Sequence, residues 1–263
     1  MGKTSVITSA ANPLLKEIRR AVTHGGRTSD GLVVAETFHL LEAALRSDLA
    51  VPVVVAAEGV RSAVESHVRG LAGVRVAVVP DSLLSEVVTT ESAQGVVALV
   101  RAPEWKLENV FSGVPLVVAL DGVQDPGNAG AILRAAEAFG ASGALFLKGT
   151  VSPHHPKTIR AAAGSTFRLP ILAGLDAELV QAALRQRKVR LYSTDPRGDT
   201  PLSRADLRSA AALVIGSEAH GVRQSLSQGS VHLRIPTRGV ESLNAAVAAG
   251  VVLYEAARQR TRT

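Results

Sequence analysis

The stretch that decides the fold is LDGVQDPGNAGAILRAAEAFG, residues 120–140. The apolar run PLVVAL leads into Asp121, and a short polar loop follows. Beyond the loop, Ile132, Ala136 and Phe139 recur at helical spacing. This is the pattern of a strand, a loop and a helix, and open α/β sheets bind ligands at the carboxyl ends of their strands. The loop lacks the three spaced glycines of a dinucleotide site, so we expect a different ligand.

The same alternation extends along the chain on both sides of this unit. After the linker, strands are predicted at 115–121, 144–148, 189–194, 211–216 and 231–235, and helices at 129–139, 157–163, 176–187 and 243–260. Alternation at this spacing predicts a parallel sheet. Residues 1–102 form a shorter α/β module, and residues 103–113 are polar, contain the only tryptophan and resemble a linker. We therefore expect an α/β protein with domains at 1–102 and 114–263.

Composition excludes several classes of protein. Hydrophobic residues make up 46% of the 263, and only 3% are aromatic, so the core must consist of Val, Leu, Ile and Ala. The absence of cysteine excludes disulfides, thiol nucleophiles and Cys-ligated zinc. No apolar run reaches the ~18 residues of a membrane span, and the N-terminus has no apolar signal core. We expect a cytoplasmic protein without a membrane partner.

Basic residues are concentrated in particular segments of this chain, whose net charge is +6. Residues 1–27 hold five basic residues and one acidic residue, and residues 103–263 carry an excess equal to the whole net charge. Lys16, Arg19 and Arg20 lie within five positions on one short predicted helix, and Lys157 and Arg160 lie on another. Such clusters favour a polyanionic partner, although a solvated helix face is the alternative.

Two loops at predicted strand ends carry residues that could do chemistry. In the first, 121–130, Asn128 is either the N-cap of the next helix or a site residue. Arg134 on that helix points away from its apolar face. In the second, 216–222, Gly216 and Gly221 allow the backbone to approach a ligand closely. Glu218 between them is either a helix-start acid or a site carboxylate.

A third loop, IPTRGVESLN at 235–244, leads into the long C-terminal helix. Ser242 could be an ordinary N-cap of that helix. Leu243, Val247, Val251 and Tyr254 form an apolar stripe along it, and its alanines and Gly250 allow close packing against another helix or another subunit.

Other functional classes lack their sequence signals. A nicotinamide enzyme would have Gly-x-Gly-x-x-Gly after its first strand, and a nucleotide-binding phosphate loop would have Gly-x-x-x-x-Gly-Lys-Ser/Thr. This sequence contains neither pattern. No Gly-x-Ser-x-Gly elbow occurs either. His154 and His155 form a pair between prolines, without the carboxylate or cysteine spacing that would suggest a metal site.

The three loops together resemble the motifs of a known family. Asn128-x-Gly130-x-Ile132-x-Arg134, Gly216-Ser217-Glu218, and Ile235-Pro236 with Ser242-Leu243-Asn244 resemble the three motifs of the SpoU/TrmH branch of the SPOUT RNA methyltransferases, over about residues 112–260. One position departs from the family pattern, because Ala219 stands where a glycine commonly follows the glutamate. The segments ITSAANPLLKEIRRA and LVVAETFHLLEAAL are similar to the ribosomal-protein-like substrate-binding domain of the family's ribosomal RNA enzymes.

The resemblance implies a fold and an activity. The fold is a ribosomal-protein-like N-terminal domain followed by a parallel-sheet domain with a deep trefoil knot, a rarity among folds. The activity is transfer of a methyl group from S-adenosylmethionine to a ribose 2′-hydroxyl of RNA by a homodimer, without a metal. Ribosomal RNA is the favoured substrate. The alternatives are a transfer RNA methyltransferase, a non-catalytic RNA-binding assembly factor and, more distantly, a nicotinamide dehydrogenase.

The resemblance also implies roles for individual residues. The catalytic group comprises Asn128, Arg134, Glu218, Ser242 and Asn244. The cofactor would lie against Thr194, Gly216, Ile235, Pro236 and Leu243. RNA would contact Lys16, Arg19, Arg20, Lys157 and Arg160. Arg134 would engage the hydroxyl or the adjacent phosphate, either as a base or electrostatically, because a guanidinium with a pKa above about 12 is a poor base.

Overall fold

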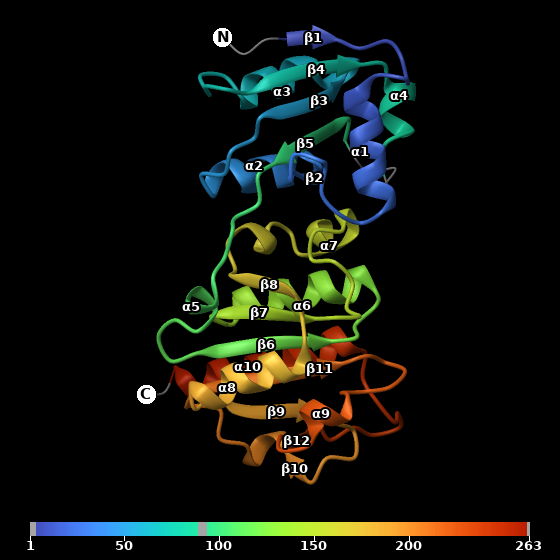
Figure 1. Ribbon diagram of the computed structural model, residues 1–263. Helices are drawn as coiled ribbons and strands as arrows, with labels where there is room; N and C mark the ends of the chain where they lie inside the picture. The colour runs from blue at the N-terminus through green and yellow to red at the C-terminus, as the bar shows by residue number, and fades with distance from the viewer. Residues whose placement is uncertain (1–3, 89–93, 262–263) are drawn as a thin grey trace. The chain divides into compact units, whose positions relative to one another are not determined.

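The structure, a computed structural model, describes residues 4–88 and 94–261 and divides into two compact units. The first unit comprises residues 1–104 together with 154–168, and the second comprises 105–153 and 169–263. Figure 1 shows the elements of both. The expected boundaries at 1–102 and 114–263 remain a prediction about folding units, but packing places the segment 154–168 with the first unit. No helix of the described residues is long and apolar enough to cross a membrane.

The first unit is a five-stranded mixed sheet with helices on both faces (Figure 1). Its strand order is β1-β4-β3-β5-β2, in which β2 and β3 run antiparallel to β5 and the other pairs are parallel. Its elements are β1 (Thr4–Val6), α1 (Pro13–Thr23), β2 (Val33–Glu36), α2 (Phe38–Arg46), β3 (Val53–Ala57), η1 (Glu58–Val60), α3 (Arg61–His67), β4 (Arg75–Val79), α4 (Asp81–Ser85), β5 (Val96–Val100), α7 (Pro156–Ala161) and η2 (Ser165–Phe167).

Alternation along the strands supplies a core on each face of this sheet. On β3, Val54 faces the cluster that contains α2 and α3, and Val55 faces the cluster that contains α1 and α4. The first of these clusters also contains Ile159 and Phe167, which are buried. The segment 154–168 therefore contributes apolar side chains to the core of the first unit.

The second unit is a seven-stranded sheet in which every strand pair is parallel, as predicted. Its strand order is β10-β12-β9-β11-β6-β7-β8. Its elements are α5 (Leu107–Val110), β6 (Leu116–Asp121), α6 (Pro126–Ala138), β7 (Gly143–Leu147), β8 (Ile171–Leu175), α8 (Ala177–Gln186), β9 (Arg190–Thr194), β10 (Thr200–Pro201), η3 (Leu202–Arg204), β11 (Ala211–Gly216), α9 (Gln224–Ser227), β12 (Val231–Arg234) and α10 (Ala245–Arg260).

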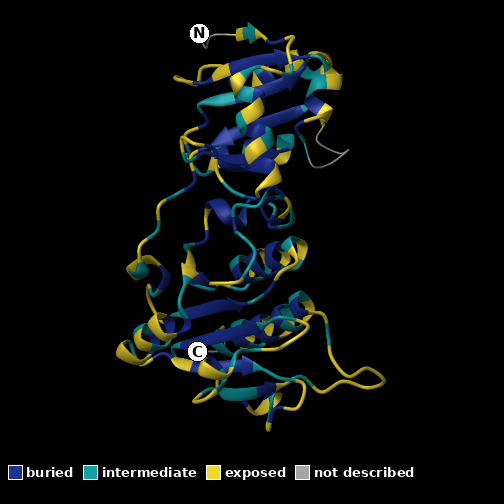
Figure 2. Cartoon of the chain, turned by 45° about the vertical axis from the view of Figure 1, so that its right-hand side comes forward, coloured by how far each residue is buried: buried dark blue, intermediate teal, exposed yellow. Residues whose placement is uncertain are grey.

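The central strands of this sheet are apolar because helices cover both of its faces. Every residue of β6 and β7 is buried, which is typical of parallel strands between two helical layers. On one face α5, α8 and α9 share a buried cluster with β6, and on the other α6 packs against α10. Figure 2 shows the buried central strands and the more exposed outer segments. The sequence did not predict β8, a short edge strand interrupted by Gly174.

Two helix starts differ from the expectation. Asp125 is the N-cap of α6, and its carboxylate accepts a hydrogen bond from the Asn128 backbone N–H at 2.7 Å. Asn244, not Ser242, is the N-cap of α10, and its Oδ1 accepts from Ala246 N at 2.9 Å. Both corrections leave Asn128 and Ser242 without a capping role. The trefoil knot that the resemblance implies stays a prediction.

Candidate active site

Loops from neighbouring strands bring the three sequence motifs to one edge of the second unit. Strands β6 and β11 are hydrogen-bonded neighbours, with Asp121 paired to Gly216 at their carboxyl ends. The loop after β6 leads into α6, and the loop after β11 contains Glu218. The third loop follows β12, the neighbour of β9 in the same sheet. Most of it is exposed, and it ends at Asn244 (Figure 2).

Asn128 lies at the centre of a chain of hydrogen bonds that joins the three motifs. Its side-chain Nδ2 donates to Oε1 of Glu218, and its Oδ1 accepts from Nδ2 of Asn244 at 3.0 Å. The partners lie 90 and 116 positions away along the sequence. Because the Asn244 side chain also caps α10, the start of that helix is held beside the start of α6. The structure thus brings three of the five predicted catalytic residues into direct contact.

Arg134 and Ser242, the other two, remain available to a ligand. Arg134 lies on the exposed side of α6, nearly two helical turns beyond Asn128, or ~9 Å along the axis. Ser242 is exposed in the third loop, two residues before Asn244. Neither side chain makes a hydrogen bond or ion pair with another described residue. An arginine in this state keeps its full donor set for a substrate oxygen or phosphate.

The predicted cofactor residues follow three adjacent strands. Thr194 ends β9 and its Oγ1 donates to the Val214 carbonyl at 3.3 Å, while Ile235 follows β12 directly and is half-buried. Leu243 is also half-buried and Pro236 is exposed. These residues offer apolar surface beside the backbone N–H and C=O groups at strand ends. Apolar surface with a few polar groups is the lining that suits an adenosine.

Gly216 is required by the geometry of the second loop itself. A Cβ at this position would overlap the backbone of Gly221 and Val222. The loop closes here, since Ser217 and Gly221 exchange two backbone hydrogen bonds, of 3.2 and 2.9 Å. Close approach of the returning chain therefore explains this glycine without a ligand.

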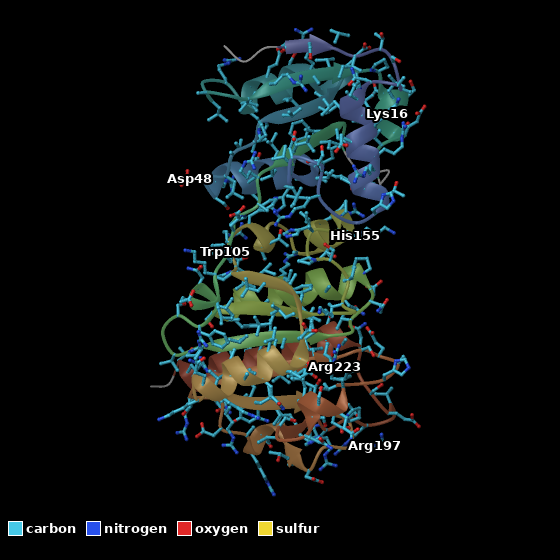
Figure 3. All side chains as sticks on the ribbon, viewed as in Figure 1. Lys16, Asp48, Trp105, His155, Arg197 and Arg223 are labelled. Atoms are coloured by element: carbon cyan, nitrogen blue, oxygen red, sulfur yellow. The ribbon has the colours of Figure 1, made fainter. Side chains whose placement is uncertain are left out.

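Sequence analysis missed one pair of functional interest, Asp121 and Arg223. The Asp121 carboxylate, 3% exposed, accepts from the Arg223 backbone N–H at 2.8 Å and lies 2.6 Å from its guanidinium. Figure 3 labels Arg223 in the second unit. The available signal was the acidic residue at the end of an apolar strand, because a buried carboxylate requires a partner.

The basic residues predicted to contact RNA differ in their surroundings. Arg19 pairs with Glu86 at 3.2 Å and Arg20 with Glu17 at 3.6 Å. Arg160 pairs at 2.6 Å with Glu36, whose side chain is 1% exposed. Lys16 (labelled in Figure 3) and Lys157 are exposed and have no ion pair with a described residue. These two lysines are the members of the group whose charge is not compensated within the first unit.

The histidine pair between prolines has a structural role in the first unit. Nη2 of Arg27 donates to Nε2 of His154 at 2.8 Å. Burial, together with this guanidinium, lowers the pKa of His154 to about 4. Nδ1 of His155 accepts from the Lys157 backbone N–H at 3.1 Å and caps α7. Within residues 4–88 and 94–261, no group of three His, Cys, Asp or Glu side chains is arranged to hold a metal ion.

Comparisons with known proteins cover both units. Residues 115–254 match the model of the SpoU rRNA Methylase family, and residues 12–98 match that of an MRM3-like substrate binding domain. The 23S rRNA (guanosine(2553)-2′-O)-methyltransferase of Bacillus subtilis is 30% identical over 250 residues, which span 94% of this chain and 97% of that protein.

Solved structures agree with the sequence matches. The SpoU methyltransferase AviRb from Streptomyces viridochromogenes, in complex with its cofactor AdoMet, has a TM-score of 0.84 at 27% identity, covering 96% of this chain and 100% of that one. An AdoMet-bound rRNA methyltransferase from Sinorhizobium meliloti has a TM-score of 0.83 at 29% identity, covering 98% of each chain. The family model spans more than half of the chain and includes the three joined motif loops, so this protein belongs to the SpoU rRNA methylase family.

Proposed function

We propose that this protein transfers a methyl group from S-adenosylmethionine to a ribose 2′-hydroxyl of ribosomal RNA. One observation carries the proposal: Asn128 binds both Glu218 and Asn244, so that three motif loops converge at the start of α6, the helix that also carries the exposed Arg134. The membership of the chain in a family of rRNA methylases, and relatives that are 23S rRNA 2′-O-methyltransferases, support it.

The chemistry requires orientation and removal of a proton. A ribose hydroxyl is a weak nucleophile, and alignment of two reactants can supply up to ~7–11 kcal/mol of the barrier. We assign to Arg134 the stabilisation of the oxygen as it loses its proton, because an exposed guanidinium without a partner among residues 4–88 and 94–261 can act on that oxygen or the adjacent phosphate. Asn128, Glu218 and Asn244 hold the site in one arrangement. Ser242, in the same loop as Asn244, would contact the ribose or phosphate.

The cofactor would bind at the carboxyl ends of β9, β11 and β12. When bound, S-adenosylmethionine supplies a methyl group that its sulfonium already activates. Ile235 and Leu243 would cover the adenine with apolar surface. Thr194, Gly216 and Pro236 would border the cofactor with backbone groups. Because Gly216 is needed for loop closure, a larger residue there would displace the second motif before it could affect the cofactor.

RNA would contact the first unit through its uncompensated lysines. Lys16 lies on the exposed side of α1, and Lys157 lies on α7 in the segment that packs into the same unit. Arg19 and Arg20 already pair with carboxylates and would contribute less. The match to a substrate-binding domain over residues 12–98 supports this unit as the RNA-binding part. The rRNA methylase family and the 23S rRNA methyltransferase relative favour ribosomal RNA over transfer RNA.

A homodimer and a cytoplasmic location remain parts of this proposal. On α10, Ala249 is buried within the unit, so it is unavailable to a partner. The exposed side instead carries Val247, Val251 and Tyr254, of which Tyr254 is 55% exposed. This stripe is where we place the contact with a second copy. At Gly250 a Cβ would meet nothing within 4 Å, so an alanine fits the single chain there.

Methyl transfer to isolated ribosomal RNA tests the proposed function. Purified protein, S-adenosylmethionine and unmodified RNA should yield a 2′-O-methylated nucleoside, detected by mass spectrometry after nuclease digestion. Asn128→Ala should lower the rate by ~10²-fold or more because it breaks both contacts in the chain of hydrogen bonds. Arg208→Ala, which alters an exposed arginine outside the site, is the matched control. RNA binding without methyl transfer by the wild-type protein would favour the assembly factor instead.

A further inference from the structure

Arg223 connects three loops at the carboxyl edge of the sheet. Its backbone N–H and guanidinium both bind the Asp121 carboxylate at the end of β6. An Nη of the same guanidinium donates to the carbonyl of Lys148, directly after β7, at 2.9 Å. Arg223 itself follows the loop after β11. One side chain therefore joins the loops that follow three adjacent strands, β11, β6 and β7.

The loop that contains Glu218 is closed on itself and is held at its exit by Arg223. Ser217 and Gly221 pair through two backbone hydrogen bonds, and the Ser217 Oγ accepts from His220 N at 3.1 Å. The loop thus forms a compact turn, and Arg223 fixes it to Asp121 two residues after its closure. If that contact is lost, the turn can shift as a body and carry Glu218 away from Asn128.

The loop after β7, which Arg223 contacts at Lys148, is also bonded to the loop after β6. Thr150 Oγ1 donates to the Leu120 carbonyl at 2.9 Å and accepts from Gly122 N at 3.0 Å. Nε2 of Gln124 donates to the Gly149 carbonyl at 2.7 Å. Residues 120–124 and 148–150 therefore form one bonded layer, to which Arg223 attaches the second motif.

Burial distinguishes this pair from the exposed ion pairs of the same unit. Asp121 is 3% exposed, whereas Asp206, which pairs with Arg208 at 2.9 Å, is 48% exposed. A buried carboxylate bound by a backbone N–H and a planar guanidinium has one defined orientation, whereas an exposed pair exchanges with water. Such a pair is suited to holding the Glu218 loop in one position relative to the end of β6.

We propose that Arg223 and Asp121 are positioning residues for methyl transfer, which hold the Glu218 loop against Asn128. This inference rests on the proposed function of the site. Neither residue touches the reacting atoms. Arginine suits the position because its planar guanidinium can donate to a carboxylate and to a carbonyl at the same time. A lysine has a single ammonium group on a flexible side chain. Misplacement of a site by about 1 Å can cost ~10²-fold in rate.

The test combines two variants with a readout that does not depend on activity. Arg223→Lys keeps the charge beside Asp121, and Asp121→Asn with Arg223→Gln replaces the ion pair by two neutral amides, so neither variant leaves a buried charge unpaired. Hydrogen–deuterium exchange of the full-length protein should show faster exchange of the amide at position 223 in both, because that amide binds the side chain of residue 121. The Gly221 amide, which is bonded to Ser217 within the turn, should exchange as in the wild type. Arg208→Lys is the matched control and should exchange as the wild type does.

Kinetics should show that the effect passes through Glu218. In steady-state assays Arg223→Lys should lower kcat by ~10–10²-fold, with the KM for RNA and the affinity for S-adenosylhomocysteine changed less than threefold. In a Glu218→Ala background the same substitution should lower kcat by less than threefold, since coupled residues are not additive. Unchanged exchange at position 223, or an equal loss of rate in both backgrounds, would overturn the proposal. Failure of the wild-type protein to transfer methyl groups would overturn the proposed function, while the exchange data would still report on the contact.

Discussion

Replacing Arg160 by alanine should unfold the first unit more easily without a comparable direct loss of RNA contacts. Its guanidinium lies 2.6 Å from the carboxylate of Glu36. Glu36 is 1% exposed and Arg160 is 30% exposed. Removal of one partner from a buried pair typically costs about 3–5 kcal/mol. We expect about 3 kcal/mol, the lower end, because Arg160 is partly solvated. A domain has only about 5–15 kcal/mol of stability, so this is a large fraction.

The assay has to show which unit is destabilised. Urea denaturation should give a lower midpoint for Arg160→Ala, and hydrogen exchange should increase at the amides of β2 and α2 but not at those of β6 and β11. Lys157→Ala, on the same short helix but exposed, is the control, and its stability should change by less than about 0.5 kcal/mol. Glu36→Gln combined with Arg160→Gln should recover part of the loss by removing the buried charge.

A direct RNA contact at Arg160 makes the opposite prediction. A phosphate contact contributes a log–log salt slope of about −0.7 on single-stranded RNA. If Arg160→Ala kept wild-type stability but flattened the salt dependence by about that amount, the guanidinium would face RNA and the reasoning from the buried pair would be refuted.

Four further outcomes follow from the described contacts. Arg134→Ala should lower the single-turnover rate by ~10²–10⁴-fold with little change in stability, because the side chain is exposed and unpaired among the described residues; near-normal turnover would demote it to a surface residue. Replacing Lys16 and Lys157 together by alanine should flatten the salt dependence of RNA binding by up to ~1.4 units, and an unchanged slope would place the RNA elsewhere. Tyr254→Arg should convert a dimer into monomers in light scattering at micromolar concentration, and a monomeric wild type would contradict the proposed interface. His154 has a pKa of about 4 in the folded protein and 6.5 as its ordinary value. The unfolded chain therefore binds more protons than the folded protein between these pH values. The free energy of unfolding should fall by at most about 3 kcal/mol from pH 7 to pH 4. His154→Asn should reduce this pH dependence.

Much of the second unit was predictable because its signals are local. β6, β7 and β11 are short apolar runs that end at or just before a polar or glycine residue, so their type follows from the sequence, while β9 and β12 also contain polar residues. The positions of the three motifs at strand ends follow from the same pattern, since parallel strands direct their carboxyl ends to one edge. β8 was missed because Gly174 interrupts it, and the edge strand β1 was missed because its three residues are too few to show a periodicity.

The helix starts show how a local signal can be assigned to the wrong residue. Asp125 and Asn128 are both of residue types that favour the N-cap position, but proline at position 126 places the start of α6 at Asp125, so Asp125 is the cap. Likewise Asn244 caps α10 although Ser242 precedes it. Asn128 is thereby released from capping, and its side chain is free to bind Glu218 and Asn244.

The sequence by itself determined the alternation of elements, the parallel sheet and the three loops that carry the site, because these depend on the spacing of neighbouring residues. Tertiary structure decided which charged side chains form ion pairs within the protein. Arg160 binds Glu36 across 124 positions, and Arg223 binds Asp121 across 102. It also decided that Ile159 and Phe167 belong to the core of the first unit. Burial of a charge or an apolar side chain is settled by what packs against it, and residues that are distant along the chain provide that packing.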